Sequence, residues 1–184
     1  MKWILFFVFS GIVVFVTTLY FNLGGHKDVI LSEVNTDGFH VIYKLHDGPY
    51  HKIINTIESV EAWAAKNNIP CPQTFGEYLD DPRSADESRL RSHGGCILSS
   101  PVSTVEQGLI QRFIVPGHYL KASFEGAPSI GPFKVYPKAE DWARSHRIQF
   151  TGPVIEVYTV KGPHSMVRSE EHTSELQSRQ SRSY

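Results

Sequence analysis

Glu156 is the residue of this chain best placed to do chemistry, because it interrupts an otherwise apolar run. The segment Pro-Val-Ile-Glu-Val-Tyr-Thr-Val at residues 153–160 has the composition of a β-strand. Successive side chains of a strand point to opposite faces, so Glu156 and Tyr158 share one face, opposite Ile155. A carboxylate on a half-apolar face is costly unless it is paired. The pattern predicts a cleft in which Glu156 meets a cationic ligand; exposure of Glu156 to solvent on an open sheet face is the alternative.

Aromatic side chains are the natural walls of such a site, since a ring attracts a cation held over its face. Beside Tyr158, four further rings are candidate walls, namely Tyr50, Tyr78, Tyr119 and Phe124. Plain packing in the core is the alternative for each of them. Trp63 and Trp142 stand at equivalent points of two expected helices, and we expect both to pack beneath the sheet.

The histidines and cysteines suggest little further chemistry. There are nine histidines, but no His-x-x-x-His or Cys-x-x-Cys spacing, so we predict no metal and no other cofactor. No Gly-x-Ser-x-Gly elbow is present for a serine nucleophile. Cys71 and Cys96 would open and close the two strands of a hairpin, which allows one disulfide in an oxidising compartment. Two free thiols in the core are the alternative.

Charge excludes one class of partner. The formal net charge is -1 and the signs are mixed along the chain. A nucleic-acid-binding domain needs a basic patch or stripe. We therefore expect no nucleic-acid partner.

One short pattern occurs twice along the chain. An acidic turn, a Trp-Ala pair and a strand ending in Tyr recur at offsets of 78, 79 and 80 residues, as Asp47/Glu125, Trp63/Trp142 and Tyr78/Tyr158. Three ordered matches predict a duplicated unit, with repeats at about 37–98 and 109–160. Neither half is long enough to bury a sizeable core alone, so the halves should pack on each other with a ligand cleft between them.

Local patterns supply the elements that hold these residues. Residues 39–46 are rich in β-formers, and residues 50–67 carry apolar side chains at helical spacing. Further strands are expected at 74–79, 89–98, 109–115, 118–124 and 153–160, and a second helix at 138–145, after an interruption by Pro128, Gly131, Pro132 and Pro137. The fold class is therefore α+β, a tandem strand–helix–strand–strand duplication with pseudo-two-fold symmetry, an antiparallel-rich sheet and both helices on one face.

The N-terminal segment predicts a membrane anchor at residues 1–25. Residues 3–23 form an apolar run without charge, of the length that crosses a bilayer as a helix. A cleaved secretory signal is the alternative, but it should have a shorter apolar core and a small-x-small site, which residues 22–25 do not offer. Lys2 before the run and Lys27 after it favour a single-pass protein whose soluble domain is extracytoplasmic.

The remaining boundaries follow from composition. Residues 26–36 read as a linker or a leading strand, and residues 37–161 as the ligand-binding domain. Residues 162–184 are expected to be a disordered tail, since they contain few apolar residues. From residue 168 this tail resembles the translated read-through of a common sequencing adapter, so we exclude it from the expected fold.

Several of these motifs resemble one known family. His46-Asp47-Gly48-Pro49-Tyr50 resembles the His-x-Gly-Pro-Tyr turn of the gyrase-inhibitor-like small-molecule-binding family, also called AraC-type effector-binding domains. Val115–Tyr119 followed by Phe124-Glu125-Gly126 is similar to the opening of that family's second repeat. Residues 153–158 resemble its closing Glu-x-Tyr strand. The resemblance covers about residues 37–160. An apolar helix directly before such a domain also resembles the endoplasmic-reticulum autophagy receptors of the testis-expressed type.

The resemblance implies a fold and two functions. The family fold is a tandem strand–helix–strand–strand duplication, and in multidrug-sensing members the glutamate equivalent to Glu156 meets aromatic cations in the cleft. Some relatives hydrolyse strained cyclopropane-bearing compounds in the same cleft. An N-terminal membrane helix replaces the helix-turn-helix reader of the regulators, so transcriptional control is not expected.

Three functions compete at this point. We expect a membrane-anchored module that binds an amphipathic or cationic small molecule through Glu156, rather than an enzyme. Hydrolysis with Glu156 as general base is the first alternative. A membrane-bound adaptor for another protein is the second, and it would be favoured by a closed, fully packed cleft and an exposed apolar patch elsewhere.

Overall fold

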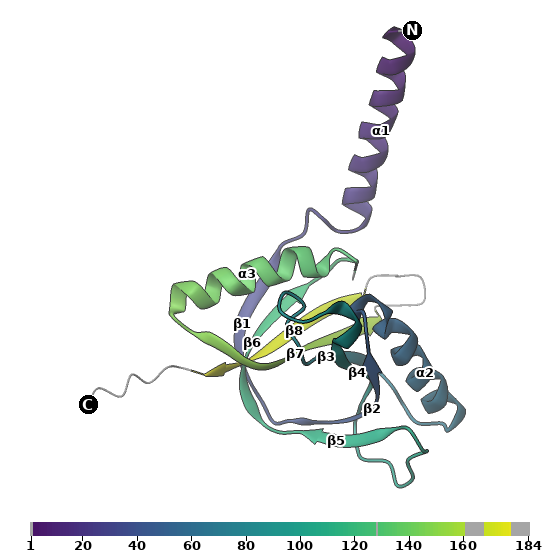
Figure 1. The fold of residues 1–184 in the computed structure, drawn as a ribbon, viewed down its shortest axis with the longest axis vertical. Coiled ribbons are helices and arrows are strands. Elements are labelled where there is room, and N and C mark those ends of the chain that lie inside the picture. Colours follow the sequence, from purple (N-terminus) through teal and green to yellow (C-terminus); the bar gives the residue numbers. More distant parts are fainter. Residues whose placement is uncertain (1, 128, 161–167, 178–184) are drawn as a thin grey trace, which may run out of the picture.

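The fold joins one long apolar helix to an α+β domain (Figure 1). It comes from a computed structural model that describes residues 2–127, 129–160 and 168–177. Helix α1 spans Lys2–Asn22, and none of its side chains is buried. It is the only helix in the described ranges that is long and apolar enough to cross a membrane.

All eight strands of the described chain belong to one sheet in which every pairing is antiparallel. The strands are β1 (Val29–Thr36), β2 (Phe39–Asp47), β3 (Gln73–Tyr78), β4 (Arg91–Leu98), β5 (Ile110–Ile114), β6 (Gly117–Phe124), β7 (Gln149–Val160) and β8 (Arg168–Gln177). Their order across the sheet is β1-β6-β8-β7-β3-β4-β2-β5.

This order is symmetric about the centre of the sheet. In the strand order, β1 can be exchanged with β5, β2 with β6, β3 with β7 and β4 with β8. The result is the original order read in reverse. The first unit contains β2, α2, β3 and β4, and the second contains β6, α3, β7 and β8. The central pair β3–β7 joins the units, with Gly76 opposite Glu156. The leading strands cross over, since β1 pairs with β6 and β5 pairs with β2.

The helix of the first unit follows the sequence pattern closely. A short 3-10 turn at Tyr50–Lys52 leads into α2 (Ile53–Lys66). Its apolar face recurs at three- and four-residue spacing, with Ile53, Ile57, Val60 and Ala64 buried. This face lies against β4, β2 and β3. Gly94 on β4 allows the close approach, because a Cβ there would lie 2.9 Å from Cγ1 of Ile57.

The helix of the second unit is longer than the sequence suggested. Helix α3 spans Gly131–His146 rather than only residues 138–145. Pro132 stands in its first turn, where the missing N–H would have no partner within the helix. Pro137 lies inside the helix with its ring exposed. The reading of Pro132 and Pro137 as interruptions was wrong, because the helix accommodates the first in its first turn and the second in its interior. Pro128 lies outside the described residues. Helix α3 packs on β6, β1 and β7.

The two terminal segments of the domain can now be assigned. Residues 26–36 contain the leading strand rather than only a linker, since β1 takes up Val29–Thr36 and pairs along its whole length with β6. Residues 168–177, expected in a disordered tail, form β8 between β6 and β7. The position between β6 and β7 can be filled by any sequence that adopts an extended backbone, because the hydrogen bonds between strands are made by main-chain groups. The rest of the expected tail, residues 162–167 and 178–184, lies outside the described residues.

The sheet buries side chains on both faces. On the helix side, Val60 and Ala64 of α2 pack with Ile42 and Cys96, and Val135 of α3 packs with Phe124. On the other side, a separate cluster contains Val41, Tyr43, Phe75, Ile114, Ile155 and Val157. The alternation along β7 therefore sends Ile155 into one layer and leaves Glu156 on the helix side.

Candidate functional site

A cavity of about 900 Å³ lies between α2, α3 and the centre of the sheet. This cavity is called the cleft below. Strands β3 and β7 form its floor, and the loop after β3 runs along its rim. Its lining includes Tyr50, Ile53, Ile54, Ile57, Tyr78, Leu79, Asp80, Asp81, Arg83, Pro132, Tyr136, Glu140, Phe150, Val154, Glu156 and Tyr158. The size is that of a small-molecule site, and apolar and aromatic side chains dominate.

Glu156 lies on the floor of the cleft with its side chain almost wholly buried, at 4% exposure. Its two oxygens have different hydrogen-bond donors. The hydroxyl of Tyr136 on α3 donates to Oε1 at 3.1 Å, and that of Tyr158 donates to Oε2. The hydroxyls of Tyr78 and Tyr158 are 3.2 Å apart. Two tyrosines therefore fix the carboxylate from opposite sides, and a third continues the chain into β3.

Burial decides the protonation state of Tyr158, the middle member of the three tyrosines. Desolvation raises the pKa of Tyr158 well above its usual value, and the nearby charge of Glu156 raises it further. The hydroxyl therefore keeps its proton at neutral pH. An ionised carboxylate can only accept hydrogen bonds. The pair is thus arranged with Tyr158 as donor and Glu156 as acceptor.

The rim of the cleft is acidic. Among the lining residues that the structure describes, the charged groups are four carboxylates (Asp80, Asp81, Glu140 and Glu156) and one guanidinium (Arg83), so the formal balance is -3. Hydrogen bonds from Arg91 lower the pKa of Asp80, and those from Arg83 lower the pKa of Asp81. Both aspartates are therefore ionised at neutral pH. Arg91, which lies outside the lining, pairs with Asp80 at 2.7 Å. The lining and this partner together therefore carry a formal charge of -2, which attracts cations.

An ion pair joins the rim across the cleft. Arg83 in the loop after β3 contacts Oε1 of Glu140 on α3 at 3.1 Å and also pairs with Asp81. The same loop is tied to the first unit, because the Tyr50 hydroxyl donates to the Asp80 carbonyl at 2.7 Å and accepts from its N–H at 2.9 Å. Helix α3 and the 3-10 turn before α2 therefore hold this loop over the cleft.

The structure brings together four of the six predicted ligand-binding residues. Glu156, Tyr158, Tyr78 and Tyr50 line the cleft. Phe124 does not, because it is fully buried beneath α3 with Val135. Tyr119 lines a separate cavity of about 300 Å³ together with Glu77, Arg112 and Ile155. Trp63 packs against the buried cluster under α2, and Trp142 stacks on His146 with ring centroids 4.1 Å apart.

Sequence reasoning missed Tyr136, which gives Glu156 one of its two hydroxyl contacts. It lies in the segment read as broken by prolines, so it was not placed on a helix facing the sheet. The signal was Pro132, since a proline is favoured in the first turn of a helix and Tyr136 then stands about one turn later. Cys71 and Cys96 are joined by a disulfide. No group of three or more possible metal ligands occurs in the described ranges.

A second buried acid lies on the opposite side of the sheet. Glu77 is 3% exposed, and its Oε2 lies 2.6 Å from Nδ1 of His93 and 2.6 Å from Nη2 of Arg112. The ring of Tyr43 stacks on His93 with centroids 4.5 Å apart. Burial opposes ionisation of Glu77, but the His93 and Arg112 contacts outweigh it and lower its pKa. The charge of Glu77 is therefore balanced by neighbouring residues of the protein, which is typical of a residue that stabilises the fold.

Comparison with solved structures places the fold. The chain matches the EcmrR C-terminal domain with a TM-score of 0.65 at 14% identity, covering 81% of this chain and 98% of that one. In the EcmrR–DNA complex the TM-score is 0.66 at 14% identity, with 81% of this chain covered, and the chain spans 57% of the length of EcmrR. SAV2435 bound to tetraphenylphosphonium matches with a TM-score of 0.57 at 9% identity, over 80% of this chain and 94% of that one.

The chain has the fold of gyrase-inhibitor-like effector-binding domains. The same fold occurs in a hydrolase from Listeria innocua, with a TM-score of 0.54 at 7% identity, over 80% of this chain and 91% of that one. No family model and no curated protein matches the sequence. At these identities the likeness concerns the fold alone, so the function has to be argued from the cleft.

Proposed function

We propose that this chain is a membrane-anchored module that binds an amphipathic or cationic small molecule in the cleft. The observation that carries the proposal is Glu156, a carboxylate 4% exposed on the floor of a cavity of about 900 Å³. A buried negative charge is costly, and a bound cation offsets that cost. Tyr78 and Tyr158 line the cleft beside the acid, and their rings add cation–π attraction to a bound cation.

Two further features support a cationic ligand. The lining together with Arg91, the partner of Asp80, carries a formal charge of -2, so a cation gains from the rim as well as from the floor. The apolar side chains of α2 in the cleft, among them Ile53 and Ile57, suit the hydrophobic part of an amphipathic molecule. SAV2435 shares the fold and is known bound to tetraphenylphosphonium, which makes that cation a reasonable probe.

Anchoring and symmetry complete the proposal. Helix α1 inserts into a membrane, and the Cys71–Cys96 disulfide favours an extracytoplasmic location for the domain, since disulfides persist in oxidising compartments. We attribute the two units to tandem duplication. The symmetric strand order and the repeated sequence pattern both support that origin. The ligand then binds at the pseudo-two-fold axis between the units.

Calorimetry of the full chain in a neutral detergent tests the binding role. Tetraphenylphosphonium should bind. Glu156→Gln should weaken its binding by on the order of 2 kcal/mol, about thirty-fold, because the variant removes the attraction between the cation and the Glu156 carboxylate. Triphenylphosphine oxide, a neutral aromatic of related shape, serves as the matched ligand. Its affinity should not change in the variant.

A second variant separates the contribution of the charge on the floor of the cleft from that of a charge at its rim. Glu140→Gln also removes one negative charge, but Glu140 is exposed on α3 and pairs with Arg83. Its effect on the phosphonium cation should be several-fold smaller, because solvent screens it. Equal affinity of the wild type and Glu156→Gln for the cation would refute the proposed mechanism.

Hydrolysis is a second candidate because the cleft holds polar groups beside Glu156. A general base needs partners that orient it, and the hydroxyls of Tyr136 and Tyr158 contact its two oxygens. In such a reaction Glu156 takes a proton from water while the water oxygen attacks a carbon of a strained ring and the C–O bond of that ring breaks. Tyr136 protonates the freed oxygen and regains a proton from Glu156, which it contacts. Turnover of a small epoxide that disappears in Glu156→Gln and falls in Tyr136→Phe would favour hydrolysis over simple binding.

The protein-adaptor alternative is less well supported. It was expected to show a closed, fully packed cleft. The cleft instead has an open volume with a charged floor, which suits a small ligand better than a filled interface.

A further inference from the structure

The foot of α1 is bonded to the domain rather than tethered by a loose linker. The N–H of Ala127 donates to the carbonyl of Leu23 at 2.9 Å. Gly24 sits directly on Gly126, where a Cβ added to Gly24 would lie 2.9 Å from the Cα of Gly126. Two glycines at this junction allow the main chains to meet. Helix α1 therefore has one defined direction relative to the second unit.

Lys134 on α3 closes the same junction. Its ammonium donates to the carbonyl of Gly25 at 2.5 Å and also to that of Lys27. It lies 5.4 Å from the centre of the Phe124 ring. The first turns of α3 are thus bound to the chain where it leaves α1. Figure 1 shows this end of α3 beside the foot of α1.

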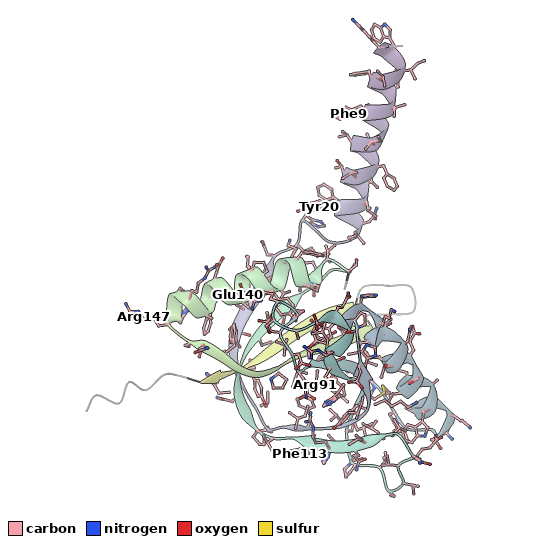
Figure 2. The ribbon with its side chains drawn as sticks, in the orientation of Figure 1. Phe9, Tyr20, Arg91, Phe113, Glu140 and Arg147 are labelled. Atoms are coloured by element: carbon pink, nitrogen blue, oxygen red, sulfur yellow. A yellow bond between two sulfur atoms is a disulfide. The ribbon has the colours of Figure 1, made fainter. Side chains whose placement is uncertain are left out.

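Figure 2 supports that placement through the labelled side chains. Tyr20 lies at the foot of α1, while Arg147 marks the opposite end of α3, away from α1. Phe9 projects from the upper part of α1 into open space. Helix α3 runs mostly crosswise to α1, with its N-terminal end beside the foot of α1 and its C-terminal end farther from it (Figure 2). With α1 across a bilayer, the N-terminal end of α3 therefore lies next to the membrane surface.

Phe133 lies in this membrane-proximal turn and is 80% exposed, more than Trp3 of α1 at 76%. Its neighbour Pro132 lines the cleft, and its other neighbour Lys134 holds the junction. Exposing a whole Phe ring to water forgoes about 2 kcal/mol of burial free energy. Helices that lie on a membrane surface bury Trp, Phe and Leu side chains at the headgroup–acyl boundary.

We propose that the N-terminal turn of α3, with Phe133 inserted, docks on the headgroup–acyl boundary of the bilayer that α1 spans. The proposal rests on anchoring by α1. The occupant is lipid rather than protein because the surface is continuous with an apolar helix whose side chains are all exposed. The docking places the α3 rim of the cleft beside the membrane surface. An amphipathic cation that partitions into the headgroup layer reaches Glu156 from there.

Site-specific fluorescence on the full chain in phosphatidylcholine vesicles tests the docking without any ligand. Phe133→Cys is labelled with an environment-sensitive fluorophore, which is specific because the two native cysteines form a disulfide. Two matched positions are labelled in the same way. Phe9→Cys reports on α1, and Leu45→Cys reports on β2, where the native side chain is 60% exposed.

The labels at positions 133 and 9 should emit at shorter wavelength than the label at position 45. Brominated phosphatidylcholine should quench the labels at 133 and 9 but not the label at 45. Quenching at 9 with a water-like signal at 133 overturns the docking and leaves the anchor and ligand binding intact. A water-like signal at both 9 and 133 overturns the anchor as well. The Lys134→Met variant, which releases the junction, should lower quenching at 133 and leave it unchanged at 9.

Discussion

The Cys71–Cys96 disulfide is expected to supply a large share of the stability of the first unit. Cys71 lies in the connection between α2 and β3, and Cys96 is fully buried in β4. The bridge therefore fixes the end of α2 to the strand on which α2 packs. Both sulfurs belong to the apolar cluster that includes Trp63 and Ile69.

The magnitude follows from the closed loop. The cysteines are 25 residues apart in sequence. In the chain-entropy description, closing such a loop removes about 12 cal/mol/K from the unfolded chain, which is about 3.5 kcal/mol at room temperature. For a domain of this size the urea dependence of the unfolding free energy is about 2 kcal/mol/M. The urea midpoint should therefore fall by somewhat less than about 2 M when the bridge is opened.

Urea unfolding of the chain from residue 26 onward measures this effect. Cys71→Ala is the preferred variant, because Cys71 is half-buried and its truncation adds little cavity cost, whereas Cys96 has none of its surface exposed. Wild-type protein in reducing agent should unfold at nearly the same urea concentration as the variant. Reducing agent should have no effect on the variant itself.

Two results would refute the reasoning. A midpoint shift worth less than about 1 kcal/mol would mean that the loop is already constrained in the unfolded chain or that the bridge is strained. A shift with reducing agent that persists in Cys71→Ala would show that the reductant acts elsewhere.

Two other perturbations concern the sheet. Glu77→Gln should lower the unfolding free energy by about 2 kcal/mol, because it removes the charge-assisted hydrogen bonds of a buried acid to His93 and Arg112, while solvent reaches the 39% exposed Arg112. Since the pKa of Glu77 is lowered in the folded state from 4.5, the stability it contributes is present above that pH and lost as the pH falls below it. Acid unfolding of the wild type and the variant should therefore converge at low pH. Gly95→Ala should prevent folding at 37 °C, because its Cβ would lie 2.0 Å from the carbonyl oxygen of Ile42; circular dichroism checks this.

Elements with a strong local period could be predicted from the sequence. The strand expected at 39–46 is observed at Phe39–Asp47, and the helix expected at 50–67 appears as a 3-10 turn followed by α2. Alternation also assigned Glu156 and Ile155 to opposite faces correctly. These predictions depend only on neighbours within about one helical turn or a few strand residues.

The errors arose where distant pairing decides the outcome. Tyr119 and Phe124 are both on β6, which is separated from β7 by β8. Two strand spacings amount to about 10 Å, so β6 lies too far from the centre of the sheet for its side chains to form the floor of the cleft. Alternation places Tyr119 and Phe124 on opposite faces, yet it cannot tell which strands come together. Strand order is a property of the whole sheet.

The centre of the sheet explains why a symmetric fold presents an asymmetric site. Gly76 and Glu156 face each other across β3 and β7, and they are separated by the same 80 residues as Tyr78 and Tyr158. Each is thus the counterpart of the other at the axis. Two carboxylates there would repel at close range, and one would be held protonated. A glycine opposite Glu156 leaves a single carboxylate on the central floor of the cleft, so the site is asymmetric although the strand order is two-fold.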